Sequence, residues 1–221
     1  MRAAVIVFPG SNCDRDMAIA LKMAGADVTM VWHKDAALPN VDLVIVPGGF
    51  SFGDYLRCGA IAAQSPICHA IASHVGRGGY ALGICNGFQV LTETGLLPGA
   101  LMRNSGLKFI CKTVDLNVAT TDSVFTECYV DGVVVKLPLA HHDGNYTIDP
   151  EGLARLHGED RVAFTYSHNP NGSLSDIAGI LSKNRRVLGM MPHPERAVTH
   201  DHGGIDGQAI FRGLLGKLTS A

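Results

Sequence analysis

The sequence lacks the charge pattern of a nucleic-acid binder and the hydrophobic length of a membrane protein. Its formal net charge is -2, and its 18 Lys and Arg residues form no block, so the basic patch of a nucleic-acid-binding surface is missing. No apolar stretch approaches the roughly 18 to 20 residues that span a bilayer. The expected ligands are therefore small molecules or other proteins, not nucleic acid or lipid.

Signatures of nucleotide binding, metal frameworks and secretion are missing too. Neither GxGxxG nor GxxxxGK[ST] occurs, which argues against nucleotide binding by this chain and leaves no cofactor to expect. The six cysteines form no CxxC pair, so most are expected to be reduced and buried. The first apolar run ends at Pro9-Gly10, too early for a secretion signal. We expect a cytoplasmic protein.

The first half of the sequence alternates strand and helix signals. Strands are expected at residues 3–8, 27–32, 42–46 and 80–84, and helices at 17–24, at 57–75 with an interruption at Pro66, and at 88–94. Charged residues make up only 17% of the chain and hydrophobic residues 47%, which favours a wide, covered sheet. The prediction is an α/β fold with an open, mostly parallel, flavodoxin-like sheet and helices on both faces.

The second half shows strand signals with few helix signals between them. Strands are expected at residues 107–118, 132–139, 162–166 and 187–191, as antiparallel additions to the same sheet, and a closing helix at 206–218. No repeat or linker appears. A single domain over residues 1–221 is therefore expected.

A glycine-flanked cysteine lies where the fourth strand should turn into a helix. The segment Gly83-Ile84-Cys85-Asn86-Gly87 has the pattern of a nucleophile elbow, with Cys85 in place of serine. Small neighbours let the helix start close to the strand, and a helix N-terminus favours the reactive thiolate. The alternative is a tight turn that holds an inert cysteine.

A glycine-rich loop follows the third strand and should lie beside this elbow. The loop reads Pro47-Gly48-Gly49-Phe50-Ser51-Phe52-Gly53-Asp54. The backbone N–H groups of Gly49 and Asn86 are candidates for an oxyanion hole, in which each donor is worth about 3 kcal/mol of barrier. A plain glycine turn or a weak phosphate loop is the alternative.

A histidine and a carboxylate follow the strand at residues 187–191, within Met191-Pro192-His193-Pro194-Glu195. His193 can act as the base for Cys85, and Glu195 can orient the imidazole, which completes a triad. The neighbouring prolines make this loop rigid.

Other histidines leave a metal site open as an alternative. His193 and Glu195 could be half of such a site together with His200 and His202. These later histidines lie in a Gly/Asp-rich stretch that indicates a solvated loop, so no metal is expected. His141 and His142 form no second ligand cluster with other residues and are assigned to a loop.

Together these segments resemble the class I (triad) glutamine amidotransferases, and within them the glutaminase subunits of phosphoribosylformylglycinamidine synthase, a purine-biosynthesis enzyme. The resemblance covers nearly the whole chain. Asn86 after the nucleophile and the segment Gly53-Asp54-Tyr55-Leu56-Arg57-Cys58 are its more specific parts. The matching segments cover residues 8–14, 47–61, 85–89, 107–111 and 189–196.

The resemblance implies roles for individual residues. Cys85 would be the nucleophile, His193 the base and acid, and Glu195 the orienting carboxylate. Gly49 and Asn86 would be the oxyanion donors. Glutamine would be bound by Gln89, with contacts expected also from Gly48, Gly144 and Asn145. The segment that contains Gly144 and Asn145 departs from the family pattern. Relatives carry His-Gly-Glu-Gly-Asn-Phe where this chain has His-His-Asp-Gly-Asn-Tyr at residues 141–146.

The resemblance also implies the reaction and its partners. Glutamine would be hydrolysed to glutamate and ammonia through a Cys thioester, and the ammonia would pass to a large ATP-dependent synthase subunit, with a small accessory subunit in the same enzyme. Two rivals remain. A stand-alone cysteine hydrolase, chaperone or deglycase of the neighbouring superfamily would place His directly after the nucleophile, where this chain has Asn86. A non-catalytic flavodoxin-like module would leave His193-Pro194-Glu195 without a purpose.

Overall fold

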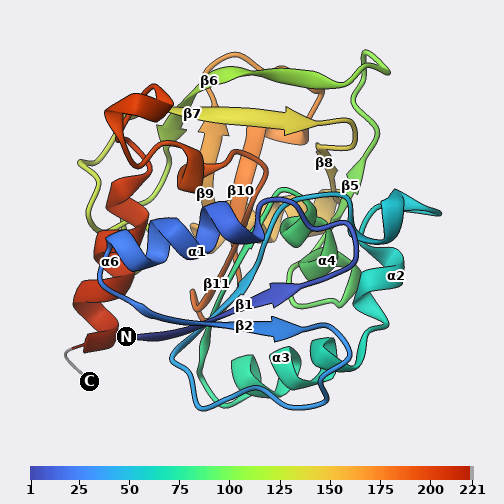
Figure 1. The fold of residues 1–221 in the computed structure, drawn as a ribbon. Coiled ribbons are helices and arrows are strands. Elements are labelled where there is room, and N and C mark those ends of the chain that lie inside the picture. Colours follow the sequence, from blue (N-terminus) through green and yellow to red (C-terminus); the bar gives the residue numbers. More distant parts are fainter. Residues whose placement is uncertain (220–221) are drawn as a thin grey trace.

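Strands and helices alternate along the first half of the chain, as the sequence predicts. The computed structural model describes residues 1–219 (Figure 1). The helical region after residue 57 is broken before Pro66, in agreement with the prediction. The elements are β1 Arg2–Val7, α1 Asp14–Met23, β2 Asp27–Trp32, β3 Leu43–Val46, the 3-10 turn η1 Ser51–Asp54, α2 Ala60–Ala63, α3 Pro66–Gly76, β4 Tyr80–Ile84 and α4 Asn86–Glu93.

The second half is richer in strands, but it contains more elements than the sequence predicts. Helix α5 was not predicted, although Pro150 in its first turn and the Asp149 side chain, which accepts from the Gly152 N–H over 2.7 Å, are helix-start signals. Strands β5, β8 and β10 were also not predicted. The elements are β5 Ala100–Met102, β6 Ile110–Val118, β7 Val134–His141, β8 Asn145–Thr147, α5 Pro150–Gly158, β9 Val162–Tyr166, η2 Leu174–Asp176, β10 Ile177–Leu181, β11 Val187–Met190, η3 Pro194–Arg196, η4 His200–His202 and α6 Gln208–Thr219.

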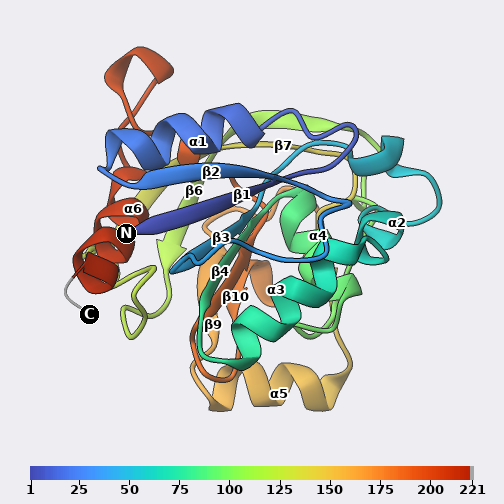
Figure 2. The ribbon, with the colours of Figure 1, turned by 60° about the horizontal axis from the view of Figure 1, so that its bottom comes forward.

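One nine-stranded sheet forms the centre of the molecule, in the order β2-β1-β3-β4-β11-β10-β9-β6-β7. The strands from β2 to β11 pair in parallel, and those from β11 to β7 pair antiparallel. Helices α1 and α6 cover one face of the parallel half, and α3 and α4 cover the other (Figure 2). The predicted α/β fold class is confirmed.

The parallel strands are apolar because both of their faces are covered. All side chains of β3, Leu43–Val46, are fully buried, which is typical of a strand in a doubly covered parallel sheet. The carboxyl ends of β1, β3, β4 and β11 share one edge, where ligands bind in open α/β sheets. None of the helices within residues 1–219 combines the length and the apolar character needed to cross a membrane.

Candidate functional site

Cys85 lies on a strained turn between β4 and α4. Its backbone has φ 52° and ψ -109°, a conformation that is costly for a residue with a side chain and that is characteristic of a nucleophile elbow. A Cβ atom on Gly87 would collide with the Val46 carbonyl oxygen, and one on Gly83 would lie 2.7 Å from the Gly87 carbonyl oxygen. Both glycines therefore allow α4 to begin directly against β3 and β4.

His193 and Glu195 form a buried pair beside Cys85. The Nδ1 atom of His193 and the Oε1 atom of Glu195 lie 2.7 Å apart, and the two residues are 1% and 3% exposed. Their loop leaves β11, the parallel neighbour of β4, in which Met190 pairs with Ile84. Cys85 and His193 therefore follow adjacent strand ends, and the bond to Glu195 orients the imidazole so that its Nε2 atom could take part in proton transfer.

The electrostatic environment favours a protonated His193. Burial alone would lower the pKa of His193, but the Glu195 carboxylate and then the Cys85 thiol outweigh it, so the pKa is raised well above its usual value. The Nε2 atom is buried and has no nitrogen or oxygen partner within residues 1–219, and the sulfurs of Cys13 and Cys85 lie close enough to the ring to raise its pKa further. A cationic imidazole beside the sulfur is the arrangement that stabilises a thiolate.

The loop after β3 lies against the same imidazole. A Cβ atom on Gly48 would lie 2.9 Å from His193 Cε1, so the glycine lets the loop touch the ring. Neither the Gly49 N–H nor the Asn86 N–H donates a hydrogen bond to any group in the part of the chain that the structure describes. The Asn86 side chain ties the loop to the elbow, because its Oδ1 accepts from the Ser51 N–H over 3.2 Å.

Gln89 and the loop between β7 and β8 meet next to the elbow. The Gln89 Nε2 donates to the Asp143 carbonyl oxygen, and its Oε1 accepts from Asn86 Nδ2 over 2.8 Å. Gly144 is held within its loop, since its N–H donates to Asn104 Oδ1 over 3.1 Å. The Asn145 Nδ2 donates to the Arg103 carbonyl oxygen over 3.5 Å, while its Oδ1 is buried without a partner among residues 1–219.

Strand β7 covers the site, although the sheet order places β7 at the edge farthest from β2. The Pro138 carbonyl oxygen accepts from the His193 N–H over 2.8 Å, and the Ala140 carbonyl oxygen lies 3.5 Å from Cys85 Sγ. His141, the last residue of the strand, is 3% exposed. Burial and then the nearby positive charge of His193 lower the pKa of His141 to about 4, so this second imidazole stays neutral.

Cys13 is a buried residue of the site for which sequence reasoning assigned no role. Its sulfur, a nitrogen of His193 and a carboxylate oxygen of Glu195 all lie within 4.8 Å of one another. Arg196 Nη2 donates to the Cys13 sulfur over 3.2 Å, so a guanidinium already occupies this side of the pair. The position of Cys13 in the matching segment at residues 8–14, directly before α1, was the signal available in the sequence.

The alternative metal site with His200 and His202 is not assembled. Both histidines are exposed in η4, and His202 Nδ1 lies 3.1 Å from the Thr199 hydroxyl. Within residues 1–219, the group of side chains spaced to hold a metal ion is Cys13, His193 and Glu195. The 2.7 Å contact of His193 with Glu195 and the Arg196 contact make this group a hydrogen-bonded cluster.

All six cysteines are free thiols. Cys13, Cys58, Cys68 and Cys85 are buried, and Cys111 and Cys128 are exposed. The expectation that most are reduced and buried is confirmed. Burial raises the pKa of Cys68 to about 12, which leaves that thiol unreactive.

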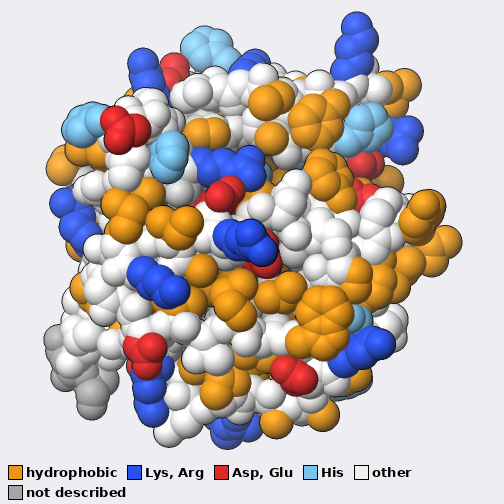
Figure 3. All heavy atoms as spheres, viewed as in Figure 1, with side chains coloured by type: hydrophobic (Ala, Val, Ile, Leu, Met, Phe, Trp, Pro, Cys, Tyr) orange, Lys and Arg blue, Asp and Glu red, His pale blue; other side chains and the backbone are white. Residues whose placement is uncertain are grey.

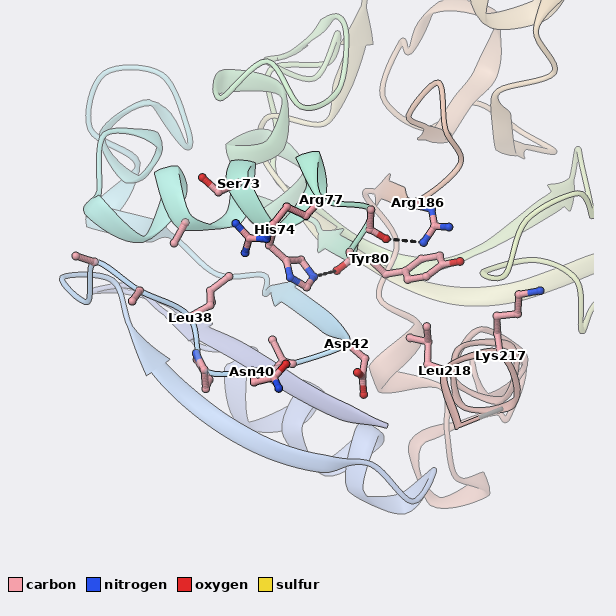
Figure 4. A pocket seen from close by; sticks show the side chains of 17 residues that line it. Leu38, Asn40, Asp42, Ser73, His74, Arg77, Tyr80, Arg186, Lys217 and Leu218 are labelled. Carbon is pink, nitrogen blue, oxygen red and sulfur yellow. Dashed lines mark hydrogen bonds between the residues drawn. The ribbon is translucent and has the colours of Figure 1, made fainter. Parts of the chain in front are cut away.

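A cavity of about 870 Å³ lies at the edge of the sheet where the parallel strands begin, opposite to the edge that carries Cys85 (Figure 4). Its lining includes Asp42 and Tyr80, which lie at the amino ends of β3 and β4, whereas Cys85 follows the carboxyl end of β4. Arg186 stacks over the Tyr80 ring, 4.8 Å from its centroid, and donates to the Gly78 carbonyl oxygen. Arg186 is therefore engaged by the protein's own backbone and by an aromatic side chain.

Charged and apolar side chains are interspersed on the face shown in Figure 3, where apolar side chains also protrude at the right edge. The loop between β3 and α2, at the right in Figure 1, carries Tyr55 and Leu56, which are 74% and 89% exposed. This loop is the same one that leads from Gly49 past the elbow.

Comparison with known proteins agrees with this geometry. The family described as "CobB/CobQ-like glutamine amidotransferase domain" matches residues 1–204. Phosphoribosylformylglycinamidine synthase subunit PurQ of Ruegeria pomeroyi is 71% identical, with 100% of each chain covered. The same subunit of Cereibacter sphaeroides is 74% identical, with 99% of each covered.

A solved structure of PurLQS from Thermotoga maritima contains a chain that is 46% identical, with a TM-score of 0.91 and 98% of each chain covered. A putative GMP synthase subunit of Thermoplasma acidophilum, 19% identical with a TM-score of 0.71, covers 100% of this chain and 95% of its own, and shares the fold. The chain is an enzyme of the glutamine amidotransferase family and belongs to its PurQ branch.

Proposed function

We propose that this chain is the glutaminase subunit of phosphoribosylformylglycinamidine synthase. It hydrolyses L-glutamine to glutamate and ammonia and passes the ammonia to the ATP-dependent synthase subunit in de novo purine biosynthesis. The observation that carries the proposal is Cys85, held on a strained turn at the strand end next to the buried His193–Glu195 pair. The relatives named PurQ support the same assignment.

The first half of the reaction forms a thioester. The Cys85 thiolate attacks the side-chain amide carbon of glutamine, and the carbonyl π electrons move onto oxygen. When the tetrahedral intermediate collapses, the C–N bond breaks and His193 Nε2 gives its proton to the leaving nitrogen, which departs as ammonia. Glu195 keeps Nδ1 protonated and the ring oriented throughout.

The second half releases glutamate. His193, now neutral, takes a proton from water, whose oxygen attacks the thioester carbon. The C–S bond breaks, the electron pair returns to the Cys85 sulfur, and the imidazolium is regenerated. One water is consumed for each glutamate and ammonia formed.

Backbone groups are proposed to stabilise the charge on the glutamine oxygen. The Gly49 and Asn86 N–H groups are the proposed donors, which is supported by their having no other acceptor within residues 1–219. Gly48 brings the loop against His193. Removing one donor of this kind costs about a hundred- to a thousandfold in rate.

The substrate contacts are proposed to come from α4 and the β7–β8 loop. Gln89, four residues after the nucleophile, joins the two segments through its bond to the Asp143 carbonyl. Asn145 offers the buried Oδ1 as an acceptor. Gly144, whose N–H is already bonded, contributes mainly by shaping the loop.

The partners follow from the chemistry and from the relatives. This chain has no phosphate loop, so the ATP-dependent step belongs to a large synthase subunit, and a small accessory subunit completes the enzyme. The solved PurLQS structure from Thermotoga maritima supports such an assembly. Residues 1–221 would act as one amidotransferase domain, although the last two residues lie outside those described. A free thiol nucleophile suits the reducing cytoplasm, where we place the protein.

Asn86 argues against the rival stand-alone hydrolases. The Asn86 Oδ1 accepts from the Ser51 N–H over 3.2 Å. The Asn86 Nδ2 donates to Asp54 Oδ1 over 3.3 Å and to Gln89 Oε1 over 2.8 Å. A histidine in this position could not make all of these bonds. The buried His193–Glu195 pair likewise argues against a non-catalytic module.

An electrophilic glutamine analogue tests the proposed nucleophile. We expect a diazoketone analogue to label Cys85, identified by peptide mass spectrometry, and glutamine to protect against labelling. The exposed Cys111 provides the matched control, because Cys111→Ala should label as the wild type does whereas Cys85→Ala should not. Label found mainly on Cys111 or Cys58 would contradict the proposal.

A further inference from the structure

The loop between β1 and α1 holds the loop after β3 through backbone hydrogen bonds. The Cys13 N–H donates to the Gly48 carbonyl oxygen over 3.3 Å, and the Phe50 N–H donates to the Gly10 carbonyl oxygen over 3.0 Å. The Gly48 carbonyl and the Gly49 N–H belong to one trans peptide unit, in which the two groups point in opposite directions. The bond from Cys13 therefore directs the Gly49 N–H away from the start of α1.

The Cys13 side chain lies between this loop and the His193–Glu195 pair. It is only 2% exposed. A Cβ atom on Gly48 would lie 3.1 Å from Cys13 Sγ and 2.9 Å from His193 Cε1. The sulfur also lies within 4.8 Å of a ring nitrogen of His193 and of a carboxylate oxygen of Glu195. One buried side chain therefore contacts both the loop that carries the proposed oxyanion donor and the proposed base.

The other hydrogen bonds of the Cys13 sulfur determine what it can do toward the imidazole. A thiol has one hydrogen to donate, and here Asn12 Oδ1 accepts it over 3.1 Å. Arg196 Nη2 donates to the sulfur over 3.2 Å. Toward His193 the sulfur is therefore left as an acceptor. An acceptor at a ring nitrogen favours the form of the ring that carries a proton there.

The guanidinium of Arg196 fixes the sulfur from the side of α1. Its Nε donates to Asp16 Oδ2 over 3.0 Å, and Asp16 lies in the first turn of the helix that Cys13 precedes. Arg196 belongs to the same short 3-10 turn as Glu195. Side chains of α1 and of the His193 loop thus meet at one sulfur atom.

We propose that Cys13 is a positioning residue of the glutaminase: its sulfur accepts a hydrogen bond from the His193 imidazolium and holds the ring against Gly48. The inference rests on the proposed glutaminase function and deepens it. In that reaction His193 must carry a proton when the leaving nitrogen departs. Cys13 forms no bond to glutamine. Its role is to keep the base charged and next to the oxyanion loop.

Other titratable and charged groups surround His193, and they remain when Cys13 is replaced. Burial lowers the pKa of His193, and the Glu195 carboxylate outweighs burial. The hydrogen bond to Cys13 raises this pKa further, after the charge on Cys85. The surrounding groups are Glu195 and Arg196 of η3, Cys85 before α4, His141 at the end of β7 and, through Arg196, Asp16 of α1.

Cys13→Ala and Cys13→Ser test the proposal in the enzyme assembled with its synthase subunit. Alanine removes the acceptor, so the imidazolium is lost at lower pH. We expect the alkaline limb of kcat for glutamine hydrolysis to move down by about one pH unit, as for loss of one hydrogen bond to a charged group. The KM for glutamine should stay near the wild-type value. Serine can donate to Asn12 and still accept from His193, so Cys13→Ser should restore most of the wild-type profile.

Cys68→Ala is the matched control, because Cys68 is a buried thiol of α3 that donates to the Ala62 carbonyl oxygen over 3.2 Å. It loses a buried sulfur as Cys13→Ala does, but its alkaline limb should not move.

An alkaline limb of Cys13→Ala at the wild-type position would overturn the inference, and so would an equal shift in Cys68→Ala. Cys13→Ser decides the question even where Cys13→Ala does not fold, since a limb displaced by about one pH unit in the serine variant would show that packing alone matters. Failure of the proposed function looks different, because wild type and Cys85→Ala would then hydrolyse glutamine alike.

Discussion

The backbone N–H of Cys85 donates a hydrogen bond to the Met190 carbonyl oxygen over 2.8 Å. This bond continues the parallel pairing of β4 with β11 beyond the strand ends. It places the start of the His193 loop at a fixed position relative to Cys85. The strand register therefore fixes the position of the His193 loop relative to Cys85.

The tight packing of the elbow predicts a specific cost for Gly87→Ala. The new Cβ would meet the Val46 carbonyl oxygen, which is backbone and cannot move aside. We expect destabilisation of roughly 1–3 kcal/mol, as for an overpacked core, together with loss of glutaminase activity. Chemical denaturation and glutamine hydrolysis measure the two effects.

Gly158→Ala is the control for this prediction. Gly158 ends α5, and a Cβ atom at this position would have no neighbouring atom within 4 Å among the described residues. The substitution should therefore be neutral or slightly stabilising. Equal stability of Gly87→Ala and Gly158→Ala would show that the elbow is less tightly packed than described.

The negative charge of Glu195 should affect how kcat for glutamine hydrolysis depends on pH. Because this carboxylate raises the pKa of His193, Glu195→Gln should lower that pKa. Steps that need the imidazolium are lost as pH rises through it, so the alkaline limb of kcat should move to lower pH. At its optimum the variant should retain more activity than His193→Ala, which lacks the proton-transfer group.

Glutamine hydrolysis measured across pH in the assembled enzyme tests this division of roles. Complete and equal losses in Glu195→Gln and His193→Ala, or an alkaline limb that does not move, would contradict it.

The proximity of Cys85, His193 and the loop at Gly48-Gly49 could be predicted from the sequence because each follows a strongly apolar strand. The elbow after β4 and the loop after β11 have local signatures, and parallel strand ends share one edge of the sheet. The sequence therefore predicts His193 as the base without any contact information.

The approach of β7 to Cys85 and the contact between Cys58 and Asp143 could not be predicted in the same way. Strand β7 reaches the site through antiparallel pairing across the far half of the sheet, which local periodicity does not reveal. Cys58 and Asp143 are 85 residues apart in the sequence. Helix α5 has a start signal at Asp149-Pro150, but it buries only Gly152 and Leu156, so its apolar periodicity is weak.

His141 should make the protein sensitive to mild acid. Its folded pKa is about 4, below its usual value of 6.5, so the unfolded state binds more protons between these values. The stability associated with neutral His141 is therefore present above pH 6.5 and is lost as pH falls toward 4, on the order of 3 kcal/mol in total. His141→Gln should make the free energy of unfolding less dependent on pH in this range.

Urea denaturation between about pH 4 and 7 measures this dependence. His157→Gln is the matched control, because His157 is exposed on α5 and its removal should leave the pH dependence as in the wild type. If the free energy of unfolding of His141→Gln falls with decreasing pH as steeply as that of the wild type, His141 is not the source of the acid sensitivity.

Amidation by the complete enzyme carrying Cys85→Ala tests the central claim most directly. The synthase reaction is measured with glutamine and, separately, with an ammonium salt as the nitrogen source. If Cys85 only generates ammonia for the partner, glutamine should give no product, while ammonium should support amidation as it does in the wild-type complex. Product formed from glutamine by the variant, or failure of ammonium to support amidation, would contradict the account.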